Sequence, residues 1–218
     1  MGTGADAPRD ADRVLSVEPG PEVETRVRGS RFIGQALPAG SVDDAGRLLA
    51  AIRRRYHDAT HHCWALRLAG PGEPEERCDD AGEPSGTAGA PILSTLRHAG
   101  LLDTLCVVTR YFGGTKLGTG GLARAYAEAA RRALEAAPRR EVWRTERVLL
   151  RCEYERLGAV EAALARAGDA LVSVDRAFDP APRLTLEVKS SRLESLVRTL
   201  TDATAGEARI ERLPGEGR

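Results

Sequence analysis

The chain has 218 residues with 32 basic and 32 acidic side chains, so its formal net charge is zero. Hydrophobic residues make up 42% of it, which is enough to build a core and excludes a wholly disordered protein. No segment approaches the roughly 18 apolar residues of a membrane span, and the first twenty residues lack the apolar centre of a secretory signal. We therefore expect a cytoplasmic protein with no membrane partner, in which any polyanion site is a local patch.

The first part of the chain predicts a flexible arm followed by an α+β domain. Residues 1–20 are polar and contain Gly and Pro, as a flexible arm does. A run that is apolar on both faces at 104–112 predicts a central strand. Further strands are predicted at 22–28, 30–37 and 62–69, helices after Ser41, after Pro91 and at 122–137, and loops at 70–76, 78–90 and 113–121.

The last part of the chain predicts a second α+β domain. Pro138, Arg139 and Arg140 form a candidate linker. Beyond it, strands are predicted at 146–153, 170–178, 183–189 and 207–213, and helices at 155–167 and 191–204, the second capped by Ser191 with Glu194. The order βαββαβ is that of the ferredoxin-like fold. We predict an arm at 1–20, one domain at 21–138 and a ferredoxin-like domain at 139–218.

The segment TRYFGGTKLGTGGLAR, residues 109–124, carries the most chemical information. Glycines leave backbone N–H groups uncovered, and the start of the following helix adds unpaired donors with a partial positive charge. No acidic residue lies in this stretch. The segment therefore predicts a site for a phosphate or carboxylate, formed by Arg110, Gly113, Gly114, Lys116, Gly118, Gly120, Gly121 and Arg124.

Known phosphate loops match this segment only in part. A Walker A loop needs Ser or Thr after its Lys, and Leu117 follows Lys116. Gly118, Gly120 and Ala123 fit the spacing of a dinucleotide fingerprint, but the parallel βαβ unit that it requires is not predicted. The phosphate loops of small-metabolite kinases usually carry serines after the Gly pair, where this loop has Leu122 and Ala123. A tight Gly-rich connection without a ligand remains an alternative.

A second loop, residues 79–89, combines carboxylates with hydroxyl groups. They could act in acid–base catalysis or hold Mg²⁺, or they could bond local backbone in a solvated turn, and Ser85 or Thr87 could cap the next helix. The four Cys have no paired metal-ligand spacing, and we predict no metal site and no cofactor. The possible accessory residues are Asp79, Asp80, Glu83, Ser85 and Thr87.

The string VVTRYFGGTKLGTGGL at 107–122, with the upstream segment at 79–93, resembles the YigZ/IMPACT family. The resemblance implies a first domain like ribosomal small-subunit protein five domain two and elongation factor G domain four. It implies a second domain like elongation factor G domain five, and a translation-linked or RNA-associated role. Ala81 departs from the family pattern, which runs Asp-Asp-Gly-Glu. We expect the bacterial two-domain form, without the N-terminal extension of eukaryotic members.

Three functions are compatible with these features. Residues 106–140 carry seven basic and two acidic side chains, which favours a regulatory module that binds RNA or the ribosome through phosphates. An enzyme acting on a phosphorylated or carboxylated metabolite is the alternative, with Asp79, Asp80 or Glu83 as base or Mg²⁺ ligand. A protein-binding adaptor that uses the C-terminal sheet is the third. The sequence does not decide whether catalysis occurs, and it gives no oligomeric state.

Overall fold

The computed structural model describes residues 12–70 and 73–213. By its internal contacts the chain forms two units. The first unit comprises residues 14–142, and the second comprises residues 143–213 together with Asp12 and Arg13. Residues 1–11, most of the predicted arm, lie outside the described residues. Among the described residues, no helix is long and apolar enough to cross a membrane.

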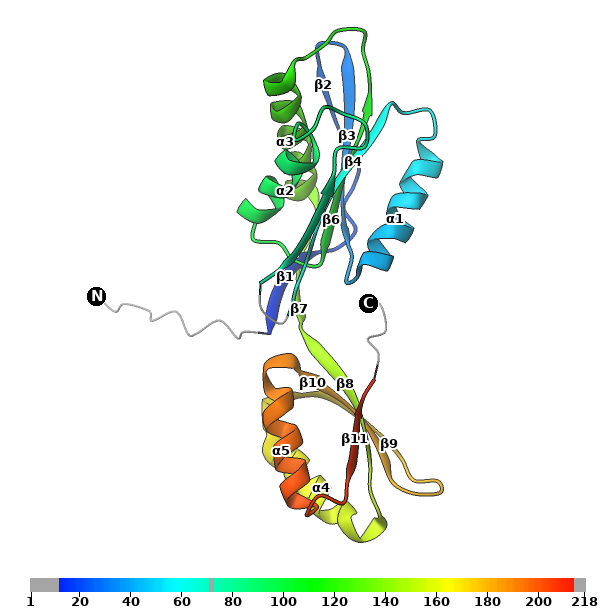
Figure 1. The fold of residues 1–218 in the computed structure, drawn as a ribbon, viewed down its shortest axis with the longest axis vertical. Helices are drawn as coiled ribbons and strands as arrows, with labels where there is room; N and C mark the ends of the chain where they lie inside the picture. Colours follow the sequence, from blue (N-terminus) through cyan, green and yellow to red (C-terminus); the bar gives the residue numbers. More distant parts are fainter. Residues whose placement is uncertain (1–11, 71–72, 214–218) are drawn as a thin grey trace, which may run out of the picture. The chain divides into compact units, whose positions relative to one another are not determined.

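The first unit is built on a five-stranded antiparallel sheet in the order β2-β3-β6-β4-β5 (Figure 1). As predicted, the apolar strand at its centre is β6, which is buried along almost its whole length. The strands are β2 (Val23–Val27), β3 (Ser30–Pro38), β4 (His61–Leu68), β5 (Glu75–Asp79) and β6 (Thr104–Tyr111).

Helices cover both faces of this sheet, which explains why β6 is apolar on both sides. Helices α2 (Gly89–His98) and α3 (Thr119–Ala136) lie on one face and α1 (Val42–Arg55) on the other (Figure 1). Cys106 and Val108 face the α2–α3 core, whereas Leu105 and Val107 face α1. The predicted helix after Ser41 is α1, and Ser41 caps it, because the Ser41 hydroxyl accepts a hydrogen bond from the Asp44 N–H.

Three segments of the first unit differ from the prediction. Residues 13–17, expected in the arm, form β1 (Arg13–Val17), which pairs with β7 (Arg139–Trp143) where a linker was expected. Residues 75–79, expected as loop, form the edge strand β5. Helix α3 begins at Thr119 rather than at 122, so the last residues of the predicted loop are its first turn.

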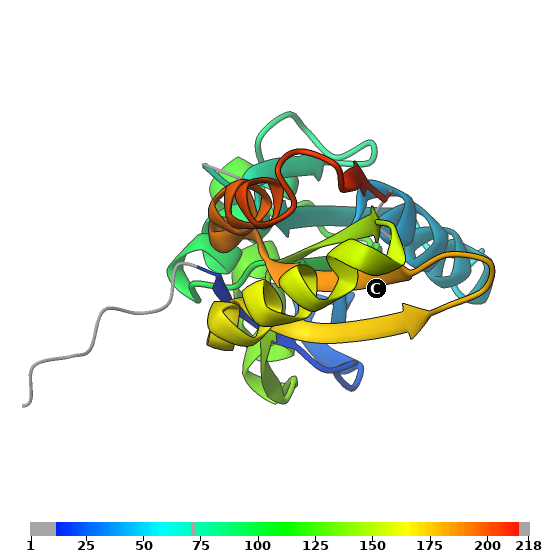
Figure 2. The ribbon, with the colours of Figure 1, turned by 90° about the horizontal axis from the view of Figure 1, so that it is seen from below.

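The second unit has the predicted element order. The order is β8 (Thr145–Arg151), α4 (Tyr154–Ala167), β9 (Leu171–Ala177), β10 (Arg183–Lys189), α5 (Leu193–Ala203) and β11 (Arg209–Arg212). The four strands form an antiparallel sheet in the order β11-β8-β10-β9. Helices α4 and α5 pack on one face of this sheet (Figures 1 and 2).

The start of α5 differs from the prediction. Ser191 does not cap the helix, because its hydroxyl donates to the Asp12 carboxylate, which also accepts the Ser191 N–H. Arg192 holds the cap position, and its side chain makes no capping hydrogen bond in the described structure.

Candidate functional site

The Gly-rich loop joins the end of β6 to the first turn of α3. Gly118 precedes the helix with φ of +70°, a left-handed conformation that glycine adopts without strain. Its carbonyl accepts the N–H of Leu122 at 2.9 Å, which closes the first helical turn. Among the described residues, no side chain caps α3, and no acidic residue lies in its first turn. The N–H groups of Thr119, Gly120 and Gly121 therefore occupy the positions that have no acceptor inside a helix.

Two exposed cations flank this turn. Lys116 and Arg124 are exposed, and in the described part of the chain neither side chain has a hydrogen-bond or ion-pair partner. A Cβ placed on Gly120 would lie 3.5 Å from an Arg124 guanidinium nitrogen, so Arg124 extends back over the start of its own helix. Positive charge near the positive end of a helix is electrostatically unfavourable, and a bound anion would relieve that conflict.

Gly113 has a structural role. A Cβ on it would lie 1.9 Å from the carbonyl carbon of Gly29 and 2.3 Å from the nitrogen of Ser30, so only glycine lets the two backbones come this close. Its N–H donates to the Ser30 hydroxyl at 3.2 Å and is not free for a ligand. Among the predicted anion-site glycines, Gly114 and Gly118 instead supply left-handed backbone on the open part of the loop.

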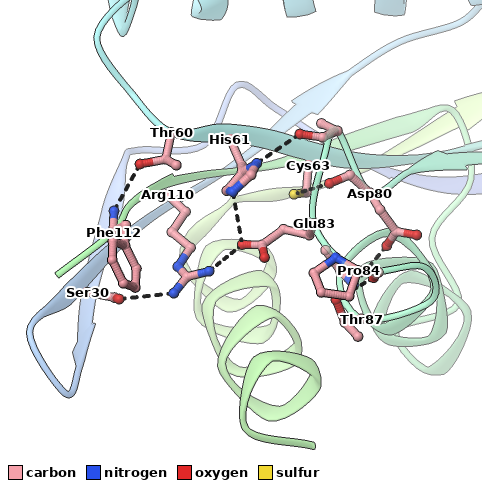
Figure 3. Close-up of polar contacts among 12 residues, drawn as sticks. Ser30, Thr60, His61, Cys63, Asp80, Glu83, Pro84, Thr87, Arg110 and Phe112 are labelled. Carbon is pink, nitrogen blue, oxygen red and sulfur yellow. Dashed lines mark hydrogen bonds and ion pairs between the residues drawn. The ribbon is translucent and has the colours of Figure 1, made fainter. Parts of the chain in front are cut away.

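Arg110 does not belong with Lys116 and Arg124. Its side chain is only 5% exposed, and its guanidinium forms an ion pair with the 3% exposed Glu83 carboxylate at 2.5 Å (Figure 3). It also donates to Ser30 at 3.2 Å. The prediction that Arg110 grips an external anion is therefore wrong, because its charge is already neutralised inside the fold.

The Arg110–Glu83 pair is the centre of a buried polar cluster that the sequence reasoning missed. The Tyr126 hydroxyl donates to Glu83 at 2.7 Å. The His61 Nε2 atom lies 3.8 Å from the same carboxylate oxygen (Figure 3). Burial is the main cause that raises the pKa of Tyr126, so its phenol stays protonated as a donor. An arginine in a strand buried on both faces was the available signal, because a buried charge needs a partner.

Cys63 lies beside this cluster, and its thiol donates to the carbonyl of Asp80 at 3.0 Å. Burial raises the pKa of Cys63 to about 12. The thiolate is the reactive form of cysteine. Cys63 is therefore a core residue and offers no nucleophile.

The acidic loop is held by its own carboxylates. Asp80 accepts three backbone N–H groups, from Gly86, Ala88 and Gly89, at 2.7–2.9 Å, and so caps the start of α2. Burial alone would raise the pKa of Asp80, but these hydrogen bonds outweigh burial and hold the pKa below its ordinary value.

The other predicted accessory residues also have local roles or none. The Asp79 carboxylate accepts the Ala81 N–H at 2.7 Å, and the Thr87 hydroxyl donates to the carbonyl of Pro84 at 2.6 Å. Ser85 is exposed. Ala81 adopts φ of +47°, so the departure from the family pattern puts a side chain in left-handed backbone. Neither Ser85 nor Thr87 caps α2, because Asp80 does.

The carboxylates of this loop do not form a metal centre in the described residues, where no group of three His, Cys, Asp or Glu could hold an ion. The predicted positive excess at 106–140 is partly balanced from outside the segment, because Arg110 pairs with Glu83 and Arg140 lies 3.7 Å from Glu18. Arg131 and Arg132 pair with Glu128, and Arg131 also pairs with Glu135. The unpaired charge next to the glycines is that of Lys116 and Arg124.

Comparison with known proteins identifies the family. Residues 28–134 match the Impact N-terminal domain. The IMPACT family member YigZ of Escherichia coli strain K12 is 30% identical over 189 residues, which cover 86% of this chain and 92% of the relative. An IMPACT family member of Haemophilus influenzae is 34% identical over 196 residues, 87% of this chain and 92% of the relative. The chain belongs to the IMPACT family.

Similarity to a solved structure extends over nearly the whole chain. A crystal structure described as that of a hypothetical protein is similar with a TM-score of 0.65 at 29% identity, and the match covers 94% of this chain and 99% of the other. The predicted IMPACT membership and the mixed fold of helices and sheets are thereby confirmed.

Proposed function

We propose that this IMPACT family protein is a translation-associated regulatory protein that binds RNA, free or in the ribosome, through phosphate groups. The translation link comes from the family resemblance. The observation that carries RNA binding is the pair of exposed cations, Lys116 and Arg124, which have no partner among the described residues and lie beside the first turn of α3. Free N–H groups and two flexible cations suit a phosphate, and such contacts give affinity with little choice of sequence.

We also propose the finer fold assignments. The order βαββαβ supports a ferredoxin-like fold for the second unit, like elongation factor G domain five. The first unit corresponds to the predicted IMPACT-type domain at 21–138, like elongation factor G domain four, with β1 and β7 added.

The enzyme alternative is less well supported. It needs a carboxylate that is free to act as base or Mg²⁺ ligand. Asp80 is saturated by backbone N–H groups and Glu83 by Arg110 and Tyr126, while Asp79 closes a turn. None of the three carboxylates faces the loop cations as an unengaged group.

Lys116→Ala tests the phosphate contact. We expect weaker binding of a fluorescein-labelled RNA hairpin at low salt. The slope of log affinity against log salt concentration should become shallower by about 0.7–0.9, which is the contribution of one phosphate contact. Fluorescence anisotropy over a salt series measures both. Arg54→Ala is the matched control, because Arg54 is exposed on α1, unpaired in the described structure and far along the chain from the loop.

The proposal has two ways to fail. A wild-type protein without RNA affinity at low salt contradicts it outright. Equal losses in Lys116→Ala and Arg54→Ala would show that net charge, and not the start of α3, attracts the RNA.

A further inference from the structure

Three arginines lie directly opposite one another on the sheet of the second unit. In the strand register, Arg151 of β8 pairs with Arg209 of β11 on one side and with Arg183 of β10 on the other. Neighbouring strands lie about 4.8 Å apart, so the three backbone positions form a short straight row. We call these residues the arginine row.

The arginine row points away from α4 and α5. Side chains alternate between the two faces of a sheet, and the neighbours Leu150, Leu184 and Ile210 pack in the helix-covered core. Arg151, Arg183 and Arg209 therefore lie on the opposite face, and all three are exposed.

This arrangement works against the stability of the sheet. Like charges directly opposite each other on neighbouring strands are destabilising. Little in the fold compensates for this. Arg151 pairs with Glu211 at 3.2 Å, but both side chains are about half exposed, and such pairs contribute little. Arg183 donates to the carbonyl of Asp179 at 2.7 Å, and Arg209 has no side-chain partner in the described structure. A chain of phosphates would supply the missing negative charge.

A hollow lies next to the row on β8, β9 and β10. It has a volume of about 230 Å³ and is lined by Leu149, Asp175, Arg176, Ala177, Arg183 and Thr185. Asp175 repels a phosphate, but its carboxylate can accept a hydrogen bond from a ribose 2′-hydroxyl, the group by which proteins distinguish RNA from DNA. Aromatic side chains are absent from its lining, so base stacking is not the basis of recognition.

We propose that the arginine row is a second RNA contact, which holds the phosphate backbone of a single strand while a ribose occupies the hollow beside Asp175. This site rests on the RNA-binding function proposed above, but it does not depend on the loop at the start of α3.

The test compares two triple variants of the full-length protein. The row variant carries Arg151→Gln, Arg183→Gln and Arg209→Gln. The control variant carries Arg166→Gln, Arg192→Gln and Arg198→Gln, which remove the same charge from exposed arginines of the same unit that have no side-chain partner in the described structure. Anisotropy with fluorescein-labelled oligouridine is measured over a salt series, and Lys116→Ala is measured in parallel.

We expect the row variant to bind more weakly and its salt slope to be shallower by about two, because each phosphate contact with a single strand contributes about 0.7. The control variant should keep most of the wild-type slope. A deoxyribose strand of the same length should bind the wild type more weakly. The row variant should melt no lower than the wild type, because opposed like charges have been removed. If it does melt lower, the single variant Arg209→Gln replaces it, with an expected change of about 0.7.

Other outcomes overturn the proposal in distinguishable ways. Equal losses in the row and control variants would show bulk charge attraction. An unchanged row variant with a weakened Lys116→Ala protein would exclude the row as an RNA contact and leave the loop as the only one of the two. Equal affinity for the deoxyribose strand would contradict the ribose contact. A wild-type protein that does not bind oligouridine at all would contradict both proposed RNA contacts, the arginine row and the loop at the start of α3.

Discussion

Arg110 has a different role in the structure from the one that its sequence motif predicts. It lies in the motif that predicts an anion site, yet it is 4% exposed and its charge is balanced by Glu83. Its guanidinium carbon also lies 5.4 Å from the ring centre of Phe32 and 5.5 Å from that of Phe112. The residue therefore ties the end of β6 to the acidic loop and to the 29–30 turn.

Removing one partner of this buried pair should be costly. We expect Arg110→Leu to lower the free energy of unfolding by about 3–5 kcal/mol, because the Glu83 charge is left buried without its cation. The double variant Arg110→Leu with Glu83→Gln should recover much of the loss. Urea denaturation of the two variants measures this difference. A single variant as stable as the wild type would contradict the pairing.

The acidic loop shows how one carboxylate organises a whole element. The Asp80 carboxylate accepts hydrogen bonds from the N–H groups of Gly86, Ala88 and Gly89 and thereby fixes where α2 begins. Because these bonds favour the charged carboxylate, they link the stability of this loop to pH.

Asp80→Asn should reveal that link. The folded pKa of Asp80 lies below its ordinary value near 3.8. Its stabilisation is therefore complete above that value and is lost as the pH falls through the folded pKa. We expect the stability difference between wild type and Asp80→Asn to be largest near neutral pH and to shrink below about pH 4. Urea unfolding at several pH values measures it, with Asp79→Asn as control. A difference independent of pH would contradict this role.

At the scale of the whole molecule, the two units have separate cores. The clusters around β6 and the cluster around β8 and β10 share no residue among those described. Each unit can therefore lose its packing without removing a core residue of the other.

Leu150→Ala tests this independence. Leu150 is fully buried in the second unit, and such a truncation costs about 2–5 kcal/mol. We expect faster hydrogen exchange throughout 146–212 and unchanged protection at 104–134, as resolved by mass spectrometry of peptides. Leu105→Ala should give the opposite pattern. Uniform loss of protection in either variant would indicate one cooperative unit.

The sequence predicted the elements that have strong apolar periodicity and missed those that lack it. The central strand β6 and the alternating strand β10 were predicted correctly because the apolar pattern of their consecutive residues matches their burial pattern. The edge strand β5, with the sequence EERCD, has no apolar face, and β1 pairs with a partner at the far end of its unit. The first turn of α3 was missed because Gly120 and Gly121 are poor helix formers.

The candidate site was predictable only in part. The uncapped start of a helix and the loop cations follow from local sequence, and the structure leaves Lys116 and Arg124 exposed there. The burial of Arg110 does not follow from local sequence, because its partner Glu83 is brought to it by tertiary folding. The arginine row depends on the strand register, which no single segment specifies.

The pairing of β1 with β7 has a consequence for synthesis on the ribosome. The first strand leaves the exit tunnel before any of its own sheet partner exists, and β7 follows only after α3 is complete. At about 5–20 residues per second, that interval is on the order of ten seconds. Val17, a fully buried residue, shares its core cluster with Phe32, Ala36 and Leu101, which precede β7, so it is the strand pairing of β1 that waits for β7. A nascent chain halted before β7 would thus expose β1 to chaperones without its partner strand.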